Sequence, residues 1–285
     1  MTNVVDPELK AIHIAVHNLY NRETTFIQSN PTSTASINGT NFLARQAILF
    51  ADAALYLMED VRQPINAAAA LLRTCLEAQA RANHIIAVTG EEREQRAGEF
   101  LQLMNVGHEY FETLGIQMTK DFAPDVSNTL PRDLPYLAAL KPLVDKCDTS
   151  NLKELKSQYK TLRDNWRYDI IIGRGRLDPA WQNRSDAQRL QPELDYRFIT
   201  MCAFVHSDPA SLKLAPTPLS VAYIAVTAEV VAVSCFFVAL GKEKDQDLLN
   251  LTKSLKAFNV NEKTLPSNDL INQLFPSPPA TPSKP

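Results

Sequence analysis

Residues 219–240 read LSVAYIAVTAEVVAVSCFFVAL, the most apolar segment of the chain. A helix that is apolar on all sides has to be buried, either in a protein core or in a membrane. About 20 apolar residues span a bilayer, so the segment is long enough for either environment. Glu229 lies near its middle, and an acidic residue there costs roughly 2.5–3.5 kcal/mol on insertion. We therefore expect a buried core helix, with a membrane span as the less favoured alternative.

The rest of the chain supplies helices that can surround this segment. Apolar residues at helical spacing and capping signals predict further helices over 7–29, 41–62, 64–89, 91–115, 151–167, 192–206 and 245–258. The composition of residues 30–40 is that of a loop, and four prolines in 116–150 allow only short helical turns there. Strand patterns are nearly absent. The sequence predicts an all-α multi-helix bundle around a long apolar C-terminal helix.

The composition is ordinary for a globular protein, and the length fits one large domain or two small ones. A chain of 285 residues can bury a sizeable core without metals or disulfides. Its net charge of −3 provides no overall field that attracts DNA or an anionic membrane. The four cysteines are far apart, no signal peptide is recognisable, and the last residues are rich in proline. We expect one domain over 1–262, a disordered Pro-rich tail over 263–285 and a cytoplasmic location.

The helix expected over 64–89 carries a row of polar residues. Arg73, Glu77, Arg81 and His84 follow one another at steps of four, four and three, which places them on one face of a helix. One interpretation is the solvated face of an amphipathic helix. The alternative is that Arg73 and Glu77 point inward as a buried ion pair, which usually serves specificity or a site rather than stability.

The helix after Pro192 contributes Tyr196, Arg197 and His206. Arg197 and His206 are nine positions apart, about half a turn out of phase, so they do not meet directly within one unbroken helix. Cys202 and His206 are spaced like a pair of metal ligands, but no further soft ligand is near. We interpret His206 as a structural hydrogen-bond partner.

Two further groups of residues have the spacing of binding sites. His13 and His17 are four apart, as in a two-histidine metal face, but no third ligand is indicated, and we place them at the border of the apolar stripe. We predict no metal and no cofactor. A mixture of aromatic and basic residues can hold phosphate and stack bases, and a weak nucleic-acid contact is assigned to Arg163, Arg167, Arg174 and Arg176.

The polar motifs resemble those of a bacterial family. The segment LLRTCLE at 71–77, then Trp181, the Tyr196-Arg197 pair and FVHSDPASL at 204–212 resemble domain of unknown function 5677. Members of that family share an R-x-x-x-E helix and a helix with Tyr-Arg followed by His. The resemblance covers roughly 71–238. It extends to the broader HEPN-like helical proteins, many of which are metal-independent ribonucleases or toxin partners.

The resemblance and the residues together leave two functions open. In the first, the protein acts through protein partners or as a homo-oligomer, and the Arg, Glu, Tyr and His side chains form a buried network. In the second, it is a HEPN-like ribonuclease or toxin or phage-defence component, and RNA is its ligand. The resemblance then implies that the catalytic residues are Arg73, Glu77, Arg197 and His206. Tyr196, Arg81 and His84 would support them. HEPN-like enzymes use an Arg and a His four to six residues apart, a spacing that this sequence does not keep.

Overall fold

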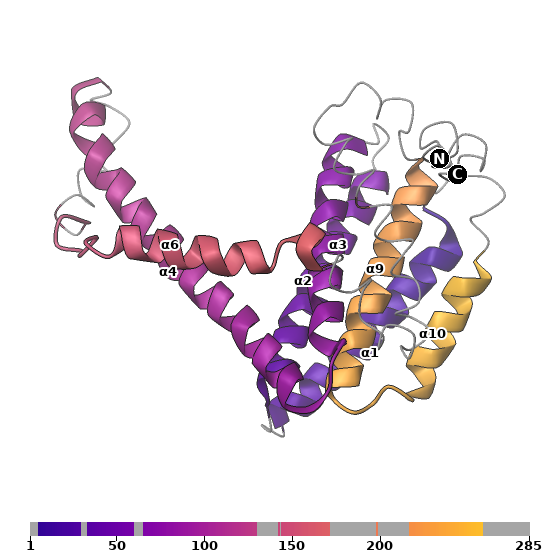
Figure 1. Cartoon of the computed structure of the whole chain (residues 1–285). Coiled ribbons are helices and arrows are strands. Elements are labelled where there is room, and N and C mark those ends of the chain that lie inside the picture. The colour runs from indigo at the N-terminus through magenta and orange to yellow at the C-terminus, as the bar shows by residue number, and fades with distance from the viewer. Residues whose placement is uncertain are drawn as a thin grey trace, which may run out of the picture.

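The computed structural model describes residues 5–29, 33–59, 65–129, 142, 144–171, 198 and 217–258. The helices along these residues are α1 (Pro7–Ser29), α2 (Ala35–Glu59), α3 (Ile65–Ile86), α4 (Gly90–Thr129), α6 (Leu152–Asn165), α9 (Pro218–Ala239) and α10 (Gln246–Ala257) (Figure 1). No β-strand occurs in this part of the chain. The prediction of an all-α bundle is confirmed.

Helix α9 is the centre of the bundle. Thr217 caps its first turn by accepting a hydrogen bond from the backbone of Ser220, and Pro218 fits the start of the helix. Every residue from Ser220 to Phe237 is buried. Helices α2 and α3 form its most extensive contacts, and α1 and α10 also pack against it (Figure 1). Burying each large apolar side chain stabilises the fold by roughly 1.5–3 kcal/mol.

The burial of α9 bears on the choice between core and membrane. By length and composition, α9 is the one helix in the described residues that could cross a membrane. However, 94% of its apolar 18-residue window is buried inside the protein. The core interpretation is therefore the one that the packing supports.

Small residues let α2 and α3 approach each other closely. Alanine is the commonest buried residue in both helices. A Cβ atom added at Gly39 of α2 would lie 3.3 Å from Cδ1 of Ile85 in α3, closer than an ordinary van der Waals contact. The glycine therefore sets the distance between the two helices at this point.

Helices α4 and α6 form an arm, which we define as residues 107–129 together with α6. Figure 1 shows α4 running obliquely away from the bundle, with α6 crossing it and leading back toward α3. A Cβ atom added at Gly107 would lie 3.1 Å from the ring of Tyr159, and that ring stacks on Tyr110 with 5.4 Å between centroids. At the inner end of α6, Trp166 is buried against Phe100.

Two helices extend well beyond their predicted boundaries. Helix α2 begins at Ala35, inside the predicted loop over 30–40, because Glu94 of α4 accepts hydrogen bonds from the backbone and side chain of Ser36 and so caps its first turn. Helix α4 continues to Thr129, beyond the predicted end near Gly115, so the prediction of only short helical turns in 116–150 is wrong for residues 116–129. A glycine inside a helix costs only about 1 kcal/mol. Contacts of its distal half with residues 147–149 stabilise the extension.

Several predicted features lie outside the described residues. They are the helix after Pro192, apart from Phe198, and the proline-rich tail over 263–285. The single domain over 1–262 also stays a prediction.

Candidate functional site

The polar row predicted on α3 forms a ladder around Glu77. Nε of Arg73 donates to Oε1 of Glu77 over 3.3 Å, and Nη2 of Arg81 lies 3.6 Å from Oε2 of the same carboxylate. The three side chains are between 25% and 34% exposed. The ladder is therefore half-buried, between the solvated face and the buried pair that the sequence left as alternatives.

Aromatic groups border the ladder on both sides. The guanidinium of Arg73 lies over the ring of Phe198 at 5.7 Å, and Nε of Arg81 donates to the carbonyl of Trp166 over 3.4 Å. Burial lowers the pKa of Arg81, and the charge of Glu77 opposes this shift. His84 is buried and meets the edge of Trp166 at 5.3 Å. Arg73, Glu77 and Arg81 are thus brought together, while His84 belongs to the neighbouring aromatic cluster.

The other predicted site residues divide into two groups. Arg163 and Arg167 are exposed, and each pairs with an adjacent carboxylate, Asp164 at 3.2 Å and Asp169 at 2.9 Å. These pairings reduce the positive charge available for a phosphate. Five predicted residues lie outside the described part of the chain: Arg174, Arg176, Tyr196, Arg197 and His206.

A second polar centre lies at the heart of the bundle. Glu229 of α9 has no exposed surface, and Nδ1 of His13 in α1 lies 2.9 Å and 3.0 Å from its two carboxylate oxygens. Burial raises the pKa of Glu229 to about 7, although the hydrogen bond from His13 pulls it down. Burial lowers the pKa of His13, but its contacts with Glu229 and Asp52 outweigh this and raise the pKa above 6.5.

Asp52 and His17 extend this centre toward the surface. Nε2 of His13 lies 3.4 Å from Oδ1 of Asp52, whose side chain is 64% exposed. The rings of His13 and His17 meet edge to face, 4.4 Å apart. One ligand atom from each of His13, His17 and Asp52 lies within 4.8 Å of the other two. Two imidazoles and a carboxylate therefore converge, with a buried carboxylate behind them.

This centre was missed by reasoning from the sequence. His13 and His17 were assigned to the border of an apolar stripe, and Glu229 was considered only for its cost in a membrane. The pairing joins residues 216 positions apart, so no local pattern contains it. A usable signal was present nevertheless: an acid in a fully apolar helix needs a polar partner, and the paired histidines of α1 offered one.

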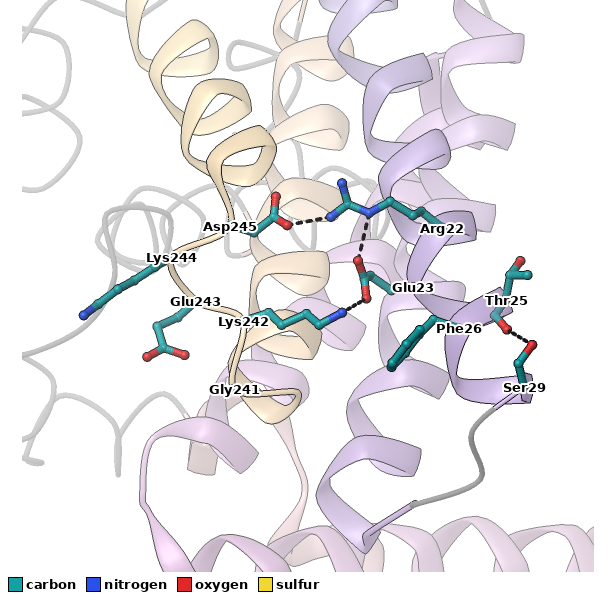
Figure 2. A pocket seen from close by; sticks show the side chains of 10 residues that line it. All are labelled: Arg22, Glu23, Thr25, Phe26, Ser29, Gly241, Lys242, Glu243, Lys244 and Asp245. Carbon is teal, nitrogen blue, oxygen red and sulfur yellow. Dashed lines mark hydrogen bonds and ion pairs between the residues drawn. The ribbon is translucent and has the colours of Figure 1, made fainter.

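A pocket of about 770 Å3 lies where the end of α1 meets the turn between α9 and α10. Figure 2 shows the buried carboxylate of Glu23 between Arg22 at 2.8 Å and Lys242 at 2.6 Å, with Arg22 also reaching Asp245 at 2.6 Å. Gly241 supplies the left-handed conformation that ends α9 here, with φ of 69°. Because these central charges satisfy one another, we interpret the group as a clasp between helices.

Comparisons of the chain with protein-family models, curated proteins and solved structures found no match. The resemblance to domain of unknown function 5677 stays a prediction.

Proposed function

We propose that this chain is a helical protein that acts by binding protein, in the first place a second copy of itself, through the arm. The observation that carries this proposal is an apolar stripe on α4. Met104, Phe111 and Met118 are spaced seven apart, which keeps them on one face of a helix. Phe111 is 56% exposed and Met118 is 49% exposed. Apolar groups aligned on a projecting element are typical of an interaction surface.

The architecture of the arm explains why it would need a partner. Two helices packed side by side cover only part of each other's surface. The ring of Phe111 meets Tyr159 of α6 edge to face, with 5.3 Å between centroids, yet Phe111 and Met118 both stay about half exposed. Two such hairpins can combine into a four-helix bundle in which apolar faces are enclosed. The proposed dimer therefore buries the stripe of one copy against the arm of the other.

The charges of the arm favour a second copy as the partner. Helix α6 carries four basic and two acidic residues. The distal half of α4 carries Glu109, Glu112 and Asp121 against Lys120. In a two-fold arrangement, the acidic helix of each copy can face the basic helix of the other.

Light scattering during size-exclusion chromatography tests this proposal on the full chain. We expect a dimer, and we expect the Phe111→Glu, Met118→Glu double variant to be monomeric at the same concentration with an unchanged helical circular-dichroism signal. Leu49→Glu is the matched control, because Leu49 is equally exposed, at 56%, but lies on α2. A monomeric wild-type chain, or dissociation by the control instead, would contradict the arm as the interface.

A second candidate function is metal-independent RNA cleavage, as the family resemblance implies. The observation that favours it is the ladder, where the two guanidinium groups of Arg73 and Arg81 share the one carboxylate of Glu77. The surplus positive charge could stabilise a phosphate while His206 takes the proton of the ribose 2′-hydroxyl. Incubation with RNA beside the His206→Ala variant tests it. Equal degradation by both proteins, or by neither, removes this candidate.

A further inference from the structure

The side chains of His13, His17 and Asp52 converge between α1 and α2. We propose that these three side chains bind a divalent transition-metal ion, with Glu229 orienting His13 from behind. This inference concerns the bundle and not the arm, so it stands independently of the proposed self-association.

The hydrogen bond to Glu229 prepares His13 for this role. When Nδ1–H donates to a carboxylate, the lone pair of the neutral ring is on Nε2, and carboxylate–histidine–metal arrangements use this device to fix the ring and raise its basicity. Nε2 is also the atom that faces Asp52, at 3.4 Å. Glu229 is therefore a positioning residue and His13 the ligand.

The spacing of the donors suits a metal ion. Zn–N and Zn–O bonds of about 2.0–2.2 Å place neighbouring tetrahedral donors about 3.3 Å apart. The separation of His13 Nε2 and Asp52 Oδ1 already meets this value. His17 offers the third donor within 4.8 Å of the other two, and a rotation of its side chain would close the remaining distance.

A second observation concerns the side chain of His17. Nε2 of His17 is buried and has no hydrogen-bond partner. A buried polar atom without a partner costs about 1–3 kcal/mol. A metal ion, or the water that it carries, would give the His17 ring a partner. The exposed side chain of Asp52 provides a route from solvent to the site.

The donor set indicates the class of ion. Two imidazoles and one carboxylate suit Zn²⁺, Co²⁺ and Fe²⁺, whereas Mg²⁺ and Ca²⁺ prefer oxygen donors alone. Three protein ligands leave at least one position open for water, as in catalytic rather than structural zinc sites.

Titration of the chelator-treated full chain with Co²⁺ and Zn²⁺ tests the site. We expect one Co²⁺ ion per chain, with the visible absorption of a four- or five-coordinate ion and no thiolate charge-transfer band, and displacement by Zn²⁺ in calorimetry. Asp52→Asn and His17→Gln should each weaken binding at least tenfold. Glu229→Gln should weaken it by about tenfold to a hundredfold through His13 alone.

Two exposed side chains serve as controls for adventitious binding. His108 and Cys147 are both exposed and lie away from the cluster, so His108→Gln and Cys147→Ser should bind Co²⁺ as the wild type does. Asp52→Asn changes an exposed group, so its folding should be intact by circular dichroism. The proposal is overturned if the wild type binds no ion stoichiometrically. It is also overturned if the cluster variants bind normally, or if binding is lost in a control instead.

Discussion

Glu229 is an acid inside an apolar helix, and His13 is the side chain that makes its burial tolerable. With no exposed surface, the carboxylate depends on this partner for hydrogen bonds that water would otherwise supply. Buried ion pairs add little net stability, but removing one partner leaves the other uncompensated. The free energy of unfolding should therefore fall markedly only when one member of the pair is removed and the other is left.

We predict that His13→Leu lowers the free energy of unfolding by about 3–5 kcal/mol. The double variant His13→Leu, Glu229→Leu should recover most of this loss, because it replaces the pair with apolar groups. Urea unfolding of the wild type, both single variants and the double variant, in chelator-containing buffer, measures the coupling. Additive effects of the two substitutions would show that the side chains do not depend on each other.

Glu94 gives a prediction about pH. Burial raises the pKa of this carboxyl, but the hydrogen bonds from Ser36, Thr34 and Ala35 together outweigh it and hold the pKa below 4.5. The folded state then binds fewer protons than the unfolded state. The stabilisation is thus fully present above about pH 4.5 and is lost as the pH falls through the folded pKa.

We expect Glu94→Gln to destabilise the protein by about 0.5–1 kcal/mol at pH 7, the usual contribution of a charge near a helix N-terminus. The difference from wild type should vanish in acid. Thermal unfolding from pH 7 down to pH 3 measures it, with Glu99→Gln on the exposed side of α4 as the control. A difference that is constant with pH would contradict the charge-based cap.

At the scale of single residues, the sequence predicted contacts between side chains that are close to each other along the chain. The steps of four from Arg73 to Glu77 to Arg81 brought those side chains together because helical geometry alone determines which residues share a face. The contact of His13 with Glu229 depends on how α1 and α9 are oriented in three dimensions, which no spacing expresses. Similarly, no sequence pattern near Ser36 indicates that Glu94, 58 residues later, caps the first turn of α2.

The arm shows how one residue can decide the packing of two helices. Gly107 leaves room for the ring of Tyr159 to lie against α4, and the ring in turn stacks on Tyr110. A larger side chain would occupy the space of the ring and separate α6 from α4.

We predict that Gly107→Leu destabilises the arm by roughly 1–3 kcal/mol, a typical cost of overpacking. Hydrogen exchange should accelerate in α6 and stay unchanged in α9. Gly98→Leu is the control, since a Cβ atom at Gly98 meets nothing within 4 Å and should stabilise α4 through its better helix propensity. Equal protection of α6 in both variants would contradict the role of Gly107.

Helix boundaries were predictable where local signals set them. Thr217 and Pro218 at the start of α9, and Asp245 before α10, are capping residues visible in the sequence. The extent of α4 was not predictable, because its distal half is stabilised by Lys120 and Gln117 reaching residues 147 and 149. Local composition lowers the helix propensity at Gly115, and tertiary contacts override it.

On the scale of the whole molecule, the chain encloses its most apolar segment in its own helices. We predict that the expressed protein is recovered in the supernatant after ultracentrifugation of a cell lysate, because the surface of α9 is already covered. Immunoblotting of the supernatant and membrane fractions measures this. Recovery with the membranes, resistant to high salt and released only by detergent, would contradict the core position of α9.

The burial of Glu229 determines how α9 is oriented about its own axis. Valine, alanine and phenylalanine side chains cover all sides of α9. Hydrophobic burial alone therefore does not determine the rotation of the helix about its axis. A shift of α9 by one residue rotates the helix by about 100°. Most contacts would then exchange one apolar side chain for another, but the carboxylate of Glu229 would move away from the ring of His13. Glu229 therefore fixes the rotation of α9. A chain without this residue would keep its helices but would lose a single, defined packing of α9 in the core.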